Sequence, residues 1–176
     1  MSAPVLTVDS ITHQAAECAW GQEHSDIPEA TVRAEALTGL FRDFQAQVAP
    51  HMDREDALAI GCLLVDVGLG IFRGYKFLPG HVRRTPGLDG MTDACAYALL
   101  DRHVTGDWGD LSDADRDANE VALNVGGRLL SCYKGVQDDS RFWTKVWVVT
   151  DGDASHETGP HSRFRLCTTV MLPSEY

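Results

Sequence analysis

The sequence has few of the features that mark a disulfide-stabilised protein, a metal centre or a membrane span. Its five cysteines are spread along the chain with no Cys-x-x-Cys pair, which argues against a disulfide framework and a zinc ribbon. Cys62 and Cys132 stand in apolar runs and are expected to be buried. The most apolar run, residues 57–72, contains Asp66 and is shorter than the ~20 apolar residues that cross a membrane. We therefore expect a buried helix here, a cytoplasmic protein with reduced thiols, and no metal, cofactor or membrane partner.

Positive charge is also scarce, because 15 lysines and arginines stand against 26 aspartates and glutamates, for a net charge of −11. This acidic balance argues against nucleic acid or an anionic membrane surface as the main partner, and it permits a basic protein partner. Residues 1–10 have neither a basic segment nor an apolar core, so no signal peptide is expected. Apolar residues make up 44% of the chain, which is ordinary globular usage.

The amino-terminal part of the chain divides into an unpatterned lead and a helical hairpin. Residues 1–24 show no sustained hydrophobic period and are expected to be loosely structured. Residues 25–75 predict two helices separated at Pro50, with Asp53 as the amino-terminal cap of the second. The second helix is apolar nearly all round, which is typical of a helix at the centre of a fold or one covered by a partner.

Residues 76–176 predict a separate domain that contains both helices and strands. Helices are expected at 92–103 and 112–124, each followed by residues that break periodic structure. Runs rich in β-branched and aromatic residues predict strands at 76–84, 128–133, 145–150 and 164–172. The expected fold class is α+β, with the helical hairpin packed beside a small domain of two helices on a three- to four-stranded antiparallel sheet.

Several blocks of the second part of the chain occur in a characteristic order. They read LDRHVTGDWGDL at 100–111, GRLLS at 127–131, WVVTD at 147–151 and TTVMLPSEY at 168–176. In this order the blocks resemble a family of short bacterial proteins that are associated with plasmids and other mobile elements and often labelled "type I restriction endonuclease subunit M". The resemblance covers residues 77–176. It implies that the proteins are related but does not imply an activity. Arg165 is the nearest match to an arginine of the family. The sequence lacks the Asn/Asp-Pro-Pro-Tyr/Phe motif and the glycine-rich loop that a methyltransferase would need.

The loop at 105–111 is the most distinctive candidate site. His103, Asp107 and Asp110 could form an acid/base pair or hold a hard cation, which would make them catalytic. Alternatively the loop is structural, with both aspartates bonded to nearby backbone and Trp108 buried with its indole N–H satisfied. We favour the structural interpretation, because no nucleophile or third ligand is fixed nearby in the sequence. Asn119 is expected to bond this loop and lock it.

A row of acidic residues between 107 and 120 could imitate the phosphates of a nucleic acid and compete for the basic groove of an enzyme. The alternative is a solvated helix face whose acids favour the amino-terminal end of the helix. His156 and His161 are not expected to bind metal, because the glycine and proline between them prevent a fixed spacing. The candidate binding residues are Trp108, Asp113, Asp117, Glu120 and Arg165.

Three classes of function remain open. The first, which we favour, is a non-enzymatic protein-binding accessory factor of a mobile element that acts on a host defence or nucleic-acid enzyme. The second is a small hydrolase or transferase that uses the His103–Asp110 loop. The third is a structural module that forms homo-oligomers. A bound partner, metal-dependent turnover, and self-association alone are the observations that distinguish them.

Overall fold

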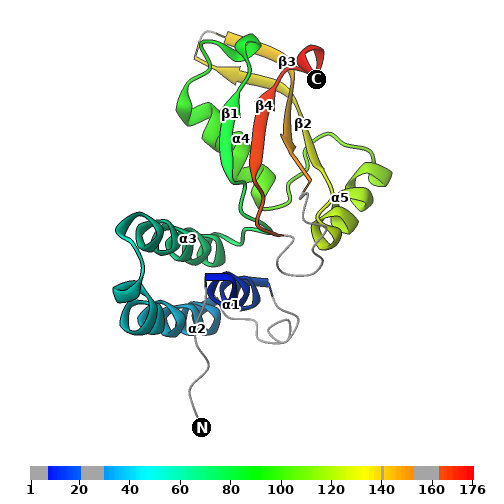
Figure 1. The fold of residues 1–176 in the computed structure, drawn as a ribbon. Coiled ribbons are helices and arrows are strands. Elements are labelled where there is room, and N and C mark those ends of the chain that lie inside the picture. The colour runs from blue at the N-terminus through cyan, green and yellow to red at the C-terminus, as the bar shows by residue number, and fades with distance from the viewer. Residues whose placement is uncertain (1–7, 21–29, 140, 153–162) are drawn as a thin grey trace. The chain divides into compact units, whose positions relative to one another are not determined.

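The chain divides into two compact units, which we call unit 1 (Met1–Gly74) and unit 2 (Tyr75–Tyr176). The computed structural model describes residues 8–20, 30–139, 141–152 and 163–176 (Figure 1). The boundary between the units lies one residue before the end of the helical hairpin expected at 25–75.

Unit 1 begins with a helix that the sequence did not predict. Residues 1–24 were expected to be loosely structured, but residues 8–20 form helix α1 (Val8–Trp20). Its buried side chains are Ile11, Ala15, Ala16 and Ala19. Alanine contributes little to a hydrophobic period, and this explains why the pattern of the segment failed to indicate a helix.

The rest of unit 1 is the predicted helical hairpin. Its segments are α2 (Ala30–Asp43), a π-helical turn (Phe44–Val48), a 3₁₀ turn (Ala49–His51) and α3 (Arg54–Arg73). The predicted cap of α3 is confirmed, because the Asp53 carboxylate accepts a hydrogen bond of 2.9 Å from the backbone N–H of Asp56. Helices α1, α2 and α3 contact one another in pairs, so their apolar faces form one shared core.

Helix α3 has apolar side chains on two faces. One face is buried in unit 1 and consists of Ile60, Leu64, Val67 and Ile71. Leu58, Val65 and Leu69 lie on the other face and are each more than half exposed. Within the described part of the chain, no helix combines the length and apolar character that crossing a membrane requires.

Unit 2 contains a four-stranded sheet in the order β1-β4-β3-β2. The strands are β1 (His81–Arg84), β2 (Leu129–Asp138), β3 (Arg141–Thr150) and β4 (Cys167–Met171). Strands β2, β3 and β4 form the predicted antiparallel meander, whereas β1 runs parallel to β4. The prediction of a wholly antiparallel sheet is therefore wrong. A local hydrophobic pattern carries no information on strand direction, and the long connection through two helices allows β1 to join the far edge in parallel.

The two predicted helices of this unit are present as α4 (Asp93–Val104) and α5 (Asp113–Val125). Thr92 and Ser112 cap them, and each side-chain oxygen accepts a backbone N–H three residues further along at 3.2 Å. Helix α5 ends at Val125 and is capped by Gly126, which has a positive φ of 69°. The predictions of α+β class and of these two helices are confirmed.

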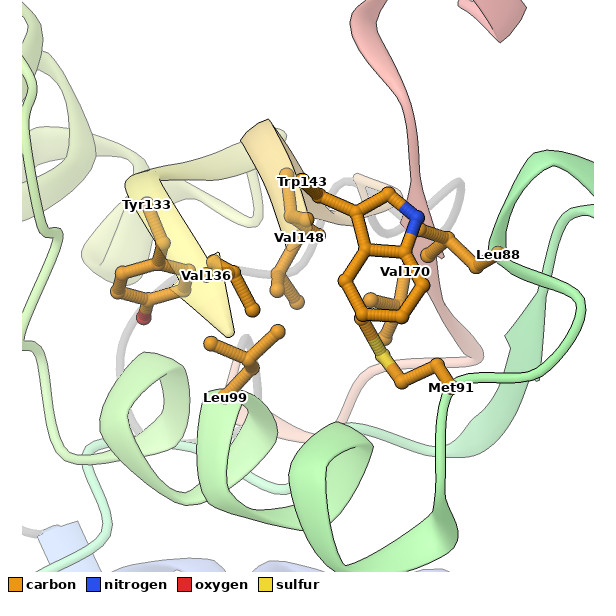
Figure 2. Packing of buried hydrophobic residues seen from close by; sticks show 9 residues of the cluster. Leu88, Met91, Leu99, Tyr133, Val136, Trp143, Val148 and Val170 are labelled. Carbon is orange, nitrogen blue, oxygen red and sulfur yellow. The ribbon is translucent and has the colours of Figure 1, made fainter. Parts of the chain in front are cut away.

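The core of unit 2 lies between the helices and one face of the sheet. Figure 2 shows Leu99 of α4 pointing toward the side chains of Tyr133, Val136 and Val148. A second cluster lies nearer α5 and contains Phe77, Leu100, Val104, Trp108, Leu123 and Leu129. The loop that carries the candidate site therefore contributes a side chain to the core.

Candidate functional site

The loop at residues 105–111, which we call the Trp108 loop, lies along the outer edge of β2. The backbone N–H of Cys132 donates to the Trp108 carbonyl at 3.1 Å, and the Asp110 N–H donates to the Cys132 carbonyl at 2.6 Å. The carboxylate of Asp110 then accepts the backbone N–H of Lys134 at 2.9 Å. The loop thus pairs backbone groups of β2 that have no neighbouring strand, which protects an edge that would otherwise be open.

Asp107, the other aspartate of the loop, is held by contacts with residues close to it in the sequence. One carboxylate oxygen of Asp107 accepts from the Arg102 guanidinium at 2.6 Å, and the other accepts from the Gly109 N–H at 3.1 Å. The hydrogen bond from Arg102 lowers the pKa of Asp107. Gly109 has a positive φ of 68°, and a Cβ at this position would lie 2.1 Å from the Cys132 carbonyl oxygen, so only glycine fits.

Trp108 is a core residue, since only 2% of it is exposed. Its indole N–H donates to a carboxylate oxygen of Glu120 at 3.0 Å, and the same oxygen accepts from the Lys76 ammonium at 2.6 Å. Burial opposes ionisation of Glu120, but the hydrogen bonds from Lys76 and Trp108 outweigh it and lower the pKa of this carboxyl. The interpretation of Trp108 as a buried, satisfied side chain is confirmed. A role of Trp108 in binding a partner stays a prediction.

His103 lies at the start of a chain of buried hydrogen bonds. Its Nδ1 is 2.6 Å from the Ser131 hydroxyl, and its Nε2 is 2.8 Å from the Thr150 hydroxyl. The Thr150 hydroxyl lies 2.7 Å from that of Thr168, which donates to the Pro79 carbonyl at 2.7 Å. All four side chains are fully buried.

The last contact of this chain determines the direction of the others. Because Thr168 donates to a carbonyl, its oxygen must accept from Thr150, and Thr150 must in turn accept from the N–H of His103 Nε2. Nδ1 is then the unprotonated nitrogen and accepts from Ser131. Burial lowers the pKa of His103 to about 3, so the imidazole stays neutral. Both ring nitrogens are occupied by protein, which leaves no atom for acid/base work on a ligand.

Asn119 does not lock the Trp108 loop as expected. Its side-chain amide donates to the Leu130 carbonyl at 2.7 Å, and its oxygen accepts the Leu130 N–H at 3.1 Å. This pair of bonds imitates a neighbouring strand on the outer edge of β2. Asn119 and the Trp108 loop therefore bond backbone groups on the same edge of β2. Asn119 bonds those of Leu130, and the loop bonds those of Cys132.

Arg165 is a buried structural residue, with 4% of it exposed. Its guanidinium donates to the Gly127 carbonyl at 2.8 Å and to the Ala122 carbonyl at 3.0 Å. These carbonyls lie at the carboxyl end of α5, where the helix dipole favours a cation. The guanidinium of Arg165 is thus engaged within unit 2, and a contact with a partner stays a prediction.

Asp113 and Asp117 differ from the other candidate binding residues, because their carboxylates face solvent. Both are exposed on α5, one turn apart and about 6 Å along the helix axis. Among the residues that the structure describes, no ion pair involves either carboxylate. Asp115 lies between them and bonds the Ser112 cap at 2.7 Å.

The structure also bears on the metal and cysteine predictions. Within the described ranges, no group of three or more His, Cys, Asp or Glu side chains is placed to hold a metal ion. His156 and His161 lie outside the described residues. Cys132 is buried as predicted, but Cys62 is exposed on α3, so the prediction for that residue is wrong.

Comparisons of the chain with protein-family models, with curated proteins and with solved structures each returned no match. The resemblance of residues 77–176 to the mobile-element proteins therefore stays a prediction.

The hydroxyl partners of His103 were not predicted from the sequence. Ser131, Thr150 and Thr168 each occupy an inward-facing position of a strand, where an apolar residue is the norm. Three hydroxyls at inward positions are a signal that a buried polar side chain needs partners. That signal points to a structural histidine instead of a catalytic one.

Proposed function

We propose that this protein is a non-enzymatic factor that binds a protein partner through the exposed carboxylates of α5. The observation that carries the proposal is the contrast between two sets of polar residues in unit 2. His103, Asp107 and Asp110 have their polar atoms engaged by neighbouring groups of the protein. Asp113 and Asp117 present theirs to solvent.

The chemistry of this face favours a basic partner. Two carboxylates one turn apart accept hydrogen bonds from arginine or lysine side chains, and the chain's net charge of −11 attracts such a partner from a distance. The resemblance to mobile-element proteins leads us to propose a host defence or nucleic-acid enzyme as the target. Its basic groove would meet carboxylates in place of phosphates, so binding would inhibit or modulate that enzyme.

The hydrolase or transferase alternative has less support. It requires a base that a ligand reaches, and His103 is fully buried with a pKa near 3. It also requires free carboxylates, whereas Asp107 is paired with Arg102 and Asp110 with the backbone of β2.

An affinity-capture experiment with matched charge variants tests this proposal. The variant Asp113→Asn/Asp117→Asn removes two charges from α5 and keeps the shape of both side chains. The control Asp89→Asn/Asp139→Asn removes two charges from exposed positions elsewhere in unit 2. We expect the wild type and the control to capture the same basic, nucleic-acid-binding enzyme and the α5 variant to lose it. Equal capture by all three proteins would contradict the proposal.

A further inference from the structure

The two edges of the sheet in unit 2 differ in how their backbone groups are paired. On the outer side of β2, Asn119 and the Trp108 loop occupy the groups of Leu130 and Cys132. On the outer side of β1, no described residue pairs with the backbone in this way. Among the residues that the structure describes, one edge is thus closed by the protein's own side chains and loop, and the other is open.

The register of β1 identifies its open groups. The His81 N–H donates to the Leu166 carbonyl at 2.9 Å, and the Thr85 N–H donates to the Val170 carbonyl at 3.1 Å. Alternate residues of a strand direct their backbone groups to the same side, so Arg83 also faces β4. The N–H and C=O groups of Val82 and Arg84 consequently point away from the sheet, which is the arrangement that accepts an added strand.

A small hollow lies beside this edge, between β1 and α4. It has a volume of about 140 Å³ and is lined by Val82, Arg83 and Arg84 of the strand and by Asp93, Ala96, Tyr97 and Leu100 of the helix. Arg84 and Asp93 form an ion pair of 2.7 Å, so the uncharged part of the lining is Val82, Ala96, Tyr97 and Leu100. Figure 1 shows α4 and β1 in this neighbouring position. Tyr97 is 66% exposed, so an apolar side chain that entered the hollow would cover apolar surface of Tyr97 that is now in water.

The opposite side of the strand carries positive charge. Side chains alternate along a strand, so the side chains of His81 and Arg83 lie on the opposite face of the sheet from that of Val82, although Arg83 also borders the hollow. The Nε–H of Arg83 donates to the Thr169 hydroxyl at 2.8 Å, and the residue is exposed to solvent. Pairing of β1 with the β1 of a second copy would bring arginines of two chains together, which disfavours self-association through this edge.

We propose that the open edge of β1 binds an extended segment of a partner protein in which apolar and acidic residues alternate. The segment adds a strand beside β1 through the backbone groups of Val82 and Arg84. Its apolar side chains enter the hollow over α4, and its carboxylates reach the guanidinium of Arg83. This surface is separate from the carboxylates of α5 and accepts the opposite charge.

Amide hydrogen exchange of the full-length protein tests whether the edge is open. The amides of Val82 and Arg84 should exchange fast, and the amide of Arg83 should be protected by β4. Protection of all three amides in the free protein would mean that another part of the chain covers the edge, and it would overturn the proposal.

Binding is then measured by NMR titration with an acetylated and amidated peptide of three Val-Glu repeats. The expected result is a saturable shift of the Val82 and Arg84 amides and slower exchange of both. A peptide of three Val-Lys repeats and a peptide with three valines followed by three glutamates should each bind at least about tenfold more weakly, because they lack the charge or the alternation. Absence of a saturable shift, or shifts located at β2 and α5, would overturn the proposal.

Two variants locate the interaction. Arg83→Glu should weaken binding of the Val-Glu peptide about tenfold and improve binding of the Val-Lys peptide. The control Lys134→Glu makes the same charge change on the other edge strand and should leave both affinities unchanged. Val82→Pro removes one outward N–H, which a strand edge tolerates, and should abolish binding while the spectrum stays that of a folded protein. Equal affinities for wild type and Arg83→Glu would contradict the assignment.

Discussion

Replacement of His103 by glutamine should make unit 2 less sensitive to mild acid. In the folded protein the imidazole is fully buried, and its pKa is lowered from 6.5 to about 3. In the unfolded chain the same side chain binds a proton below about pH 6.5. Proton uptake therefore favours the unfolded state as the pH falls. The free energy of unfolding is therefore unaffected by protonation of His103 above about pH 6.5 and falls progressively as the pH is lowered from there.

The size of this effect follows from the linkage between protonation and folding. One proton taken up only by the unfolded chain lowers the free energy of unfolding by about 1.4 kcal/mol per pH unit. Between about pH 6.5 and about pH 5 the loss from His103 is therefore about 2 kcal/mol, a large share of the ~5–15 kcal/mol that stabilises a domain. Asp107, Glu120 and Glu175 have lowered pKa values, so they add to the loss mainly at lower pH.

Denaturant unfolding followed by tryptophan fluorescence measures this effect. A Trp20→Phe background leaves Trp108, Trp143 and Trp147 as reporters, all in unit 2. The His103→Gln variant should be less stable at neutral pH, because it loses ring contacts, but its free energy of unfolding should vary much less between about pH 6.5 and about pH 5. Parallel losses of stability in the two proteins over this range would refute the reasoning.

Three further changes test other parts of the structure. Trp108→Ala should cost unit 2 about 3–5 kcal/mol in denaturant unfolding, and an unchanged midpoint would contradict a core role. Asn119→Leu should cost about 1–3 kcal/mol for each Leu130 backbone group left unpaired, with faster exchange of the Leu130 amide, and normal protection there would argue against the edge-covering role. A fragment of residues 75–176 should be soluble and unfold in one cooperative transition, whereas aggregation would show that it needs unit 1.

Most helices of the fold could be predicted from the sequence because their signals are local. The caps at Asp53, Thr92 and Ser112 lie within three residues of the groups they bond. Helix α1 could not be predicted, since its buried face is mainly alanine. The parallel direction of β1 was also missed, because it depends on how the chain returns to the sheet after α5 and not on the residues of the strand.

The candidate site was predictable in part. A buried Trp108 and a locally bonded Asp107 followed from the size of the indole and from turn chemistry, whereas the Asp110 carboxylate bonds the distant backbone N–H of Lys134. The partners of these residues come from distant segments, as with Glu120 for Trp108 and Thr150 for His103, and a single sequence does not bring such segments together. The internal contacts of Arg165 were missed for the same reason, because its partners at Ala122 and Gly127 lie about forty residues earlier.

Two pairs of carboxylates in unit 2 should respond in opposite ways when their charges are removed. The measurement is the dissociation constant of the captured partner by titration calorimetry, paired with the unfolding midpoint of each variant. Asp113→Asn/Asp117→Asn should weaken binding about tenfold or more and lower the midpoint only slightly, because Asp113 loses a favourable interaction with the amino-terminal end of α5. Asp107→Asn/Asp110→Asn should lower the midpoint and leave the dissociation constant unchanged. Loss of binding, or of a metal-dependent turnover, in a fully stable Asp107→Asn/Asp110→Asn variant would contradict the proposed function.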